Sequence, residues 1–267
     1  MKLSLHETQQ KQRINWYALV NHYENMPAEV FQKISDHIVE PLYLTTPLES
    51  LLDRSPLVVS LKKGDVLINS LPQKETLYFA APLDISFEQV LDQLRNRLQL
   101  QYDGDRKGLF HYYVPSVASY FFYRASEADS SKWLGCLSAV YFYKQIKSEE
   151  DEWVVIEGEF SPFSPSTWLL TLSQEQGLND KFIEQEIDSW AHAENIPSFN
   201  WKNQKSVSSF CTQHQIEQPK LLSTLRHLVH TYNVSLDIQY HVDENQVPEN
   251  IVKQLEQLIS REYNYVR

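Results

Sequence analysis

The sequence predicts an N-terminal mixed α/β lobe followed by a smaller, mostly α-helical C-terminal lobe. Three observations support this prediction. Short aromatic and β-branched runs, typical of strands, are concentrated before residue 160. Apolar residues at helical spacing dominate after residue 167. Between them lies Ser161-Pro162-Phe163-Ser164-Pro165-Ser166, whose composition is typical of a linker. We therefore expect two domains, residues 1–160 and 167–267.

Local patterns predict the strands and helices of the first lobe. Strands are expected at 16–20, 57–61, 76–80 and 108–113, and a hairpin from 137–146 and 153–156 around the acidic turn 149–152. Pro27 and Pro115 each predict the first turn of a helix, where the missing amide hydrogen costs nothing. The first of these helices is expected to carry Val30, Phe31, Ile34 and Ile38. Ser86 and Gln89 have the spacing of a capping box before an apolar helical stripe of Val90, Leu91, Leu94 and Leu98.

The second lobe is dominated by helical spacing. Ser173 and Gln176 predict a capped helix with an apolar face of Phe182, Ile183, Ile187 and Trp190. Pro219 and Pro248 predict the first turns of two further amphipathic helices. Residues 234–242 alternate apolar and polar, which by itself predicts a strand between these helices.

Composition excludes several classes of function. The 267 residues carry a formal net charge of −11, and an acidic surface is unsuited to nucleic acid or an anionic membrane. Only six glycines occur, and their spacing fits neither G-x-G-x-x-G nor the Walker A loop. The G-x-S-x-G motif of serine hydrolases is also absent. A basic protein partner remains open.

Cysteine usage and hydropathy predict a cytoplasmic protein. Cys136 and Cys211 are far apart in sequence, so neither a disulfide framework nor a cysteine-based zinc site is expected. The N-terminus turns polar at once, which predicts no signal peptide. The longest apolar tract, around 134–143, is shorter than the ~20 residues that a membrane helix needs.

No pattern in the sequence assembles a catalytic or metal site. His227 and His230 are three residues apart, as are Cys211 and His214, but each pair lacks the further ligands that zinc usually requires. His192-Ala193-Glu194 resembles half of a zinc-deaminase signature whose P-C-x-x-C half is missing. Carboxylate pairs one helical turn apart, such as Glu88/Asp92 and Glu184/Asp188, are expected on solvated helix faces. We expect no metal, no cofactor and no small-molecule substrate.

The aromatic run Tyr120-Phe121-Phe122-Tyr123 is the candidate for partner binding. Four consecutive side chains on a helix cannot all face one stripe of the core, so at least one should point elsewhere. Core packing is favoured over an exposed docking patch by about two to one. The acidic turn 149–152 is most simply a solvated loop, although it is suited to a basic partner.

An ordered set of segments resembles one protein family. The segments that carry the resemblance are Trp16-Tyr17-Ala18-Leu19-Val20, Glu40-Pro41-Leu42-Tyr43, Thr46-Pro47-Leu48-Glu49, Ser55-Pro56-Leu57-Val58-Val59, the helix 87–98, Phe110-His111-Tyr112-Tyr113 and Trp153-Val154-Val155-Ile156. Together they resemble the bacterial type VI secretion adaptor chaperones, the Tap/TEC family, from about residue 14 to 158. Leu172-Ser173-Gln174-Glu175-Gln176 is similar to the start of the family's helical lobe.

The resemblance implies an adaptor with no catalysis of its own. Members of the family bind a toxic effector and load it onto the secretion spike protein VgrG or its PAAR tip. The implied partners are therefore the N-terminal segment of an effector and the VgrG or PAAR spike protein. Two departures stand out: the family's Tyr-Asp-Pro-Arg is Tyr113-Val114-Pro115-Ser116 here, and its Trp-Gly dipeptide near Leu77-Tyr78 is absent.

Two other functional classes remain open. A hydrolase or transferase with an unrecognised site would need a cleft containing two groups with strongly shifted pKa values within hydrogen-bond reach. An immunity protein would block a toxin by acidic complementarity. A small folded domain usually suffices for that task, so the second lobe counts against it.

Overall fold

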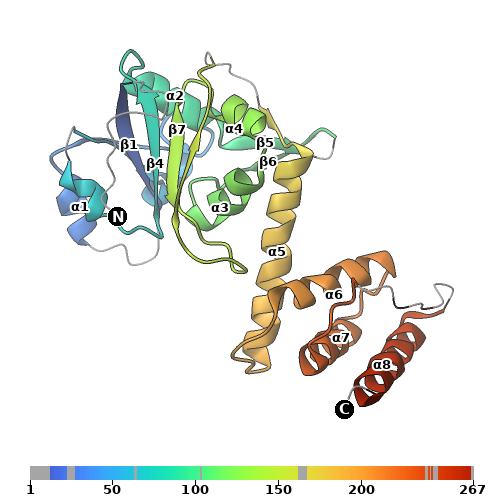
Figure 1. Ribbon diagram of the computed structural model, residues 1–267. Coiled ribbons are helices and arrows are strands. Elements are labelled where there is room, and N and C mark those ends of the chain that lie inside the picture. Colours follow the sequence, from blue (N-terminus) through green and yellow to red (C-terminus); the bar gives the residue numbers. More distant parts are fainter. Residues whose placement is uncertain are drawn as a thin grey trace. The chain divides into compact units, whose positions relative to one another are not determined.

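The structure is a computed structural model that describes residues 13–22, 28–62, 65–102, 104–161, 167–237, 240, 242 and 246–265. The chain divides into two compact units, Met1–Lys181 and Phe182–Arg267. The first contains an antiparallel sheet with helices, and the second is helical (Figure 1). This confirms the predicted fold class.

A six-stranded sheet forms the centre of the first unit. Its strands follow the order β2-β3-β1-β4-β7-β8, and every neighbouring pair is antiparallel. The strands are β1 (Ile14–Val20), β2 (Ile38–Pro41), β3 (Leu57–Ser60), β4 (Thr76–Pro82), β7 (Ala139–Tyr143) and β8 (Trp153–Glu157). The predicted hairpin is β7 and β8, in which Tyr141 lies opposite Val155. β2 and β8 are the two edge strands; in β8 Val155 is exposed and the other four residues are partly buried.

Each face of this sheet has its own core. One face packs against α2 (Phe87–Asn96), α3 (Pro115–Arg124) and α4 (Glu127–Leu134), and the other against α1 (Ala28–Ile34) and the 3-10 helix η2 (Val66–Asn69) (Figure 1). Successive side chains of a strand point to opposite faces of the sheet, which explains the two cores. Tyr17 and Phe79 contribute to the first core, and Trp16 and Tyr78 contribute to the second. A further 3-10 helix, η1, spans Glu49–Arg54.

A small second sheet contains only part of the strand predicted at 108–113. It has the order β6-β5-β9, formed by β5 (Gln99–Tyr102), β6 (Arg106–Leu109) and β9 (Trp168–Leu169). The strand predicted at 108–113 therefore ends at Leu109. Phe110, Tyr112 and Tyr113 are buried outside any ladder, and the Tyr112 hydroxyl donates to the Leu94 carbonyl at 2.8 Å. Their apolar character reflects core packing rather than strand pairing.

The predicted start of α2 is confirmed, and the predicted length of α1 is wrong. The Gln89 amide donates to the Ser86 hydroxyl and the Ser86 amide donates to the Gln89 side chain, which completes the capping box. Helix α1 ends at Ile34, so Ile38 is not on its apolar face; it begins β2 and is 66% exposed. Pro27 lies outside the described residues.

The helices of the C-terminal part are α5 (Leu172–Ala193), α6 (Trp201–Gln213), α7 (Pro219–Tyr232) and α8 (Pro248–Tyr265). The starts predicted at Pro219 and Pro248 are confirmed. Ser173 is not a cap, because α5 begins at Leu172 and the Gln174 side chain accepts from the Thr171 amide at 3.3 Å. The second unit has its own core, built by α6, α7 and α8.

The strand predicted at 234–242 is wrong where the structure describes it. Residues 234–237 form no strand, and residues 238, 239 and 241 lie outside the described part. Leu236 is buried, and its amide donates to the Ser206 hydroxyl at 2.8 Å. Val234, Tyr240 and Val242 pack against the helical core, so the apolar alternation marks a segment that covers helices.

The linker predicted at 161–166 lies outside the described residues except for Ser161. The two compact units divide later, between Lys181 and Phe182, within α5. The first half of α5 belongs with the N-terminal unit, since Leu178 packs against its core and Gly177 approaches the backbone carbonyl of Tyr120. A side chain at position 177 would meet that carbonyl at 2.5 Å, which explains the glycine.

Candidate functional site

Three of the four aromatic side chains proposed for partner binding are buried. Tyr120, Phe121 and Phe122 are at most 2% exposed, whereas Tyr123 is 38% exposed. Phe121 and Phe122 pack around Trp133, with ring centroids 5.8 and 4.8 Å away. The Tyr120 hydroxyl accepts a hydrogen bond from the Lys147 amide at 3.1 Å. An exposed patch of four aromatic residues is therefore ruled out, and only Tyr123 remains available to a partner.

Burial of consecutive aromatic residues is possible because α3 is covered on more than one side. The core between α3 and the sheet takes Phe121 and Phe122. The loop after β7 and the start of α5 approach Tyr120. The assumption that a helix has a single buried stripe holds for surface helices and fails for this one.

Tyr123 lies in a compact group of charged residues. The Lys144 ammonium is 4.6 Å from the centre of its ring, and the Arg124 guanidinium is 5.7 Å from it. The Lys144 side chain is only 4% exposed and pairs with Glu152 at 2.7 Å and Glu149 at 3.0 Å. Burial lowers the pKa of Lys144, but the hydrogen bonds from Lys144 to these glutamates raise it more, so it lies above its usual range.

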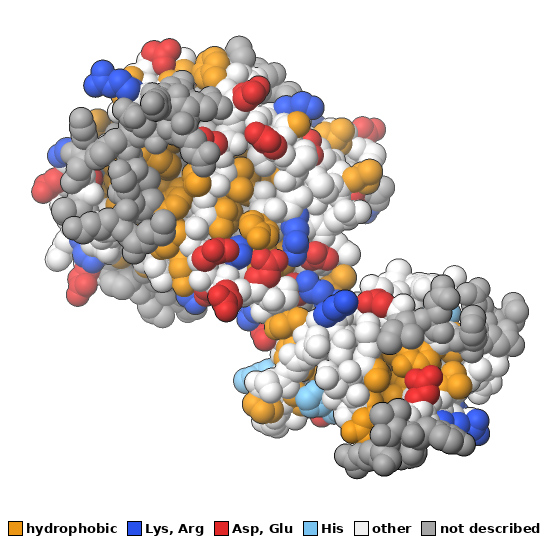
Figure 2. Space-filling view, viewed as in Figure 1, with side chains coloured by type: hydrophobic (Ala, Val, Ile, Leu, Met, Phe, Trp, Pro, Cys, Tyr) orange, Lys and Arg blue, Asp and Glu red, His pale blue; other side chains and the backbone are white. Residues whose placement is uncertain are grey.

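These ion pairs largely neutralise the acidic turn 149–152. Glu149 also pairs with Arg124 at 3.1 Å, and Asp151 pairs with Lys74 at 3.2 Å. Acidic and basic side chains accordingly intermix at the lower edge of the α/β unit (Figure 2). The turn is therefore neither a simple solvated loop nor an uncompensated acidic patch.

A groove of about 380 Å³ lies beside Tyr123. One wall is formed by the end of α3 and the first part of α4, and the other by β8 and the residues after it. Its lining residues are Phe122, Tyr123, Ala125, Glu127, Ser130, Val155, Ile156, Glu157, Gly158 and Glu159. The lining thus combines aromatic and aliphatic residues with three glutamates, and no lysine or arginine is among the described residues that line it.

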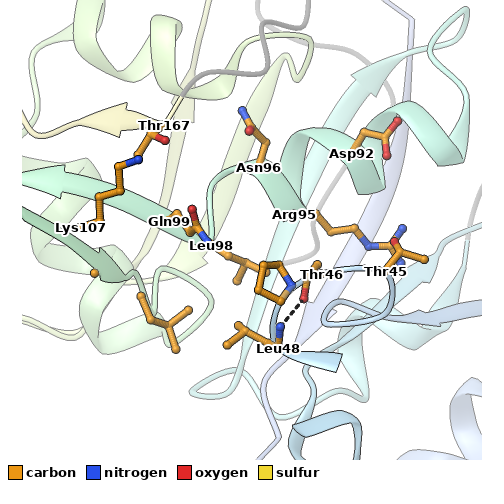
Figure 3. A pocket seen from close by; sticks show the side chains of 13 residues that line it. Thr45, Thr46, Leu48, Asp92, Arg95, Asn96, Leu98, Gln99, Lys107 and Thr167 are labelled. Carbon is orange, nitrogen blue, oxygen red and sulfur yellow. Dashed lines mark hydrogen bonds between the residues drawn. The ribbon is translucent and has the colours of Figure 1, made fainter. Parts of the chain in front are cut away.

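A larger groove of about 680 Å³ lies between α2, the loop 45–48 and β6 (Figure 3). Lys107 and Thr167 lie at one end, and Asp92 and Thr45 at the other. Arg95 is largely engaged within the protein: it pairs with Glu40 at 2.6 Å and donates to the Leu42 carbonyl at 3.3 Å. Among the described residues that line it there is neither histidine nor cysteine. This arrangement fits polar binding better than nucleophilic chemistry.

A chain of hydrogen bonds joins Tyr43, Tyr113 and His111. The two phenol oxygens are 2.6 Å apart, and the Tyr113 hydroxyl is 2.8 Å from His111 Nδ1. Burial and the bond from Tyr43 raise the pKa of Tyr113 above its usual range, and burial lowers that of His111. Tyr43 and Tyr113 are at most 5% exposed, and none of the three residues lines either groove. The chain fixes the turn before α3 to the segment after β2.

Three of the four residues considered as metal ligands, His227, His214 and Cys211, are engaged in other contacts, and His230 is exposed. His227 lies 3.5 Å from Glu194 and packs edge-on against Trp190. His214 packs against Phe210, and burial raises the pKa of the Cys211 thiol to about 11. Within the described ranges, no group of three or more His, Cys, Asp or Glu residues is arranged to hold a metal ion. That the protein carries no zinc stays a prediction.

Residues 16–132 match a family model described as "Domain of unknown function (DUF4123)". The match covers less than half of the 267-residue chain and lies within the first compact unit. It includes α2, α3 and most of β1 and α4, but neither β8 nor the helical unit. No curated protein and no solved structure matches the chain significantly. In the part of the chain that the structure describes, no helix has the length and apolar character needed to cross a membrane.

Proposed function

We propose that this protein is a cytoplasmic adaptor chaperone of bacterial type VI secretion. It binds a cognate toxic effector and promotes loading of that effector onto the VgrG or PAAR spike, without catalysis of its own. The observation that carries the proposal is the similarity of residues 16–132 to DUF4123. This range includes all the segments that resemble the Tap/TEC adaptors up to Tyr113, but not Trp153–Ile156.

The surface of the first unit supports a binding role. Tyr123 and the groove beside it offer aromatic surface next to the carboxylates of Glu127 and Glu159. Aromatic side chains are enriched at interface hot spots, and a net charge of −11 accelerates association with a basic partner. An effector or spike segment that is basic and extended fits these properties.

One feature bears on the alternative that the protein is an enzyme. Tyr113 and His111 have shifted pKa values and are in hydrogen-bond reach of one another. A raised pKa keeps the Tyr113 phenol protonated, and neither residue lines a described groove where a substrate could reach it. Catalysis needs such groups in a cleft, so this pair favours a structural role.

The test of the proposal is the partner recovered from cells. The tagged chain is purified from a secretion-competent strain, and bound proteins are identified by mass spectrometry. We expect an effector and a spike protein, and we expect deletion of the adaptor to abolish secretion of that effector alone. Recovery of neither protein, together with unchanged secretion after deletion, would refute the proposal.

Tyr123 gives a residue-level prediction of this function. Tyr123→Ala should weaken effector binding by about thirtyfold in calorimetry, because truncating an interface aromatic typically costs ~2 kcal/mol. Tyr123→Phe keeps the ring under Lys144 and should bind like the wild type. Phe122→Ala instead removes a core side chain and should lower the melting temperature. If Tyr123→Ala leaves binding unchanged, Tyr123 is not part of the interface.

A further inference from the structure

None of the described strands pairs with the outer edge of β8. The sheet ends at β8, and no other described strand pairs with it. Lys144 donates its amide to the Glu152 carbonyl at 2.6 Å, and Gly158 donates to the Ser138 carbonyl at 2.9 Å. In an antiparallel ladder, hydrogen-bonded and non-hydrogen-bonded residue pairs alternate. The residues between the hydrogen-bonded positions, Trp153, Val155 and Glu157, therefore direct their backbone N–H and C=O groups away from β7, toward the outer edge.

Within the described residues, β8 has none of three features that commonly prevent edge pairing: proline, lysine or a bulge. Proteins protect edge strands with proline, lysine or a bulge. The sequence of β8 is WVVIE, with neither proline nor lysine, and its register with β7 is continuous over five residue pairs. At the opposite edge of the sheet, β2 ends in Pro41. Val155, in the middle of β8, is 41% exposed.

The groove of about 380 Å³ lies along the same strand. Val154 and Ile156 pack against the core between the sheet and the helices, so the groove opens on the helix side of β8. A strand added to the edge would direct every second side chain to that side. The groove offers such a side chain the ring of Tyr123 and the carboxylates of Glu127 and Glu159.

The charge of the groove selects the occupant. The carboxylates of Glu127 and Glu159 line it, and none of the described lining residues is a lysine or an arginine, so a cationic side chain is attracted and an acidic one is repelled. The neighbouring Lys144 is already paired with Glu149 and Glu152. A second copy of this chain, with a net charge of −11, is disfavoured by the same repulsion.

We propose that the outer edge of β8 binds an extended, basic segment of a partner protein, which adds to the sheet as a strand and inserts one Arg or Lys side chain into the groove between β8 and the α3–α4 corner. This inference rests on the proposed adaptor function and specifies the chemistry of the segment that is bound. Main-chain hydrogen bonds along β8 supply affinity, and the groove supplies specificity.

The test uses three fluorescent seven-residue peptides and the full-length protein. One alternates valine with arginine, one has the same composition with N-methylated backbone amides at alternate positions, and one alternates valine with glutamate. We expect the first to bind with an affinity that falls as salt rises. The other two should bind about tenfold more weakly or not at all, because N-methylation blocks edge pairing and glutamate meets like charge.

Variants of β8 test the location. Val155→Pro removes an outward-directed N–H without removing a bond to β7, and should abolish binding of the arginine peptide. Val155→Lys leaves the backbone intact and should weaken binding by about tenfold through repulsion, which covers the case in which the proline variant does not fold. Ile38→Lys, at the opposite edge of the sheet, is the matched control and should bind like the wild type.

Variants of the groove test the charge. Glu159→Gln and Glu127→Gln should each weaken binding of the arginine peptide by roughly threefold to tenfold and reduce its salt dependence. Glu88→Gln, an exposed glutamate that does not line the groove, should have no effect. Thermal melts of all variants check that the fold is retained.

The proposal is overturned if the wild type does not bind the arginine peptide, if the N-methylated peptide binds equally well, or if Ile38→Lys weakens binding as much as Val155→Lys. Dimerisation of the wild type that is lost in Val155→Lys would show that a second copy occupies the edge, and would also overturn it. If the peptides fail but cells still yield an effector, the adaptor function stands without this site. If the peptides behave as expected but no secretion partner is recovered, the docking edge stands without the adaptor function.

Discussion

Asp65 connects two loops of the first unit through one carboxylate. It accepts hydrogen bonds from the amides of Leu67 and Lys62, at 2.9 and 3.1 Å, and lies 2.6 Å from His37 Nε2. Burial alone would raise the pKa of Asp65, but the bonds from Leu67, His37 and Lys62 lower it below its ordinary value of 3.8. The folded state therefore binds the ionised form better than the unfolded chain does.

We expect Asp65→Asn to lower the free energy of unfolding by about 1–2 kcal/mol at pH 7. A depressed pKa contributes stability that is present above the unfolded-state value and is lost as pH falls through the folded-state value. The difference between wild type and variant in urea denaturation should thus be constant near neutrality and shrink below pH 3.8. Asp84→Asn, at an exposed position, is the control and should change stability little. A difference that grows toward acid would contradict this explanation.

Both thiols should be unreactive in the native protein. Cys136 and Cys211 are 2% and 6% exposed, and burial raises the pKa of each thiol. The thiolate is the reactive form, so a disulfide reagent at pH 8 should modify neither cysteine until the chain unfolds. Rapid modification of one cysteine under native conditions would show that its unit opens locally.

Among the helices, α3 has no side-chain N-cap. Val114 occupies the cap position with extended backbone, and Pro115 follows at the first helical position. Val114→Thr keeps the branched shape and adds a hydroxyl oxygen that can accept a hydrogen bond from a backbone N–H of the first helical turn. We expect this variant to raise the free energy of unfolding by about 0.5–1 kcal/mol. Ser126→Val removes the hydroxyl that accepts a hydrogen bond from the Asp129 backbone amide at the start of α4, and should lower the free energy of unfolding by about 1 kcal/mol. Chemical denaturation gives the free energy of unfolding of both variants. A loss of stability in both would contradict the capping argument.

Helix starts were predictable where one or two adjacent residues set them. Ser86 with Gln89, Pro115, Pro219 and Pro248 all mark helix starts in the structure, because capping and the proline effect act within a single turn. The wrongly predicted strands at 108–113 and 234–242, which include Tyr113 and Leu236, have a different origin. Both side chains are apolar and buried, but distant residues decide whether burial occurs in a ladder or in a covering loop.

For the whole molecule, the division into two compact units predicts two unfolding transitions in calorimetry. Leu255→Ala, in the core of the second unit, should lower one transition by an amount equivalent to about 2–5 kcal/mol. Phe79→Ala, in the first unit, should lower the other. If either substitution shifts both transitions together, the continuous helix α5 couples the units into one cooperative structure.

The sequence by itself determined the fold class, the hairpin of β7 and β8, the capped start of α2, the helix starts at Pro115, Pro219 and Pro248, and the absence of phosphate-binding and nucleophile motifs. These features depend on short-range periodicity and on residue spacing. It also pointed to the run 120–123, but could not say which of these side chains is exposed. Only the tertiary structure decided that Tyr123 alone reaches the surface, that the acidic turn is internally paired, and that β8 is an edge strand beside an acidic groove. The physical reason is that exposure, ion pairing and strand order depend on contacts between residues far apart in the chain, which local patterns do not encode.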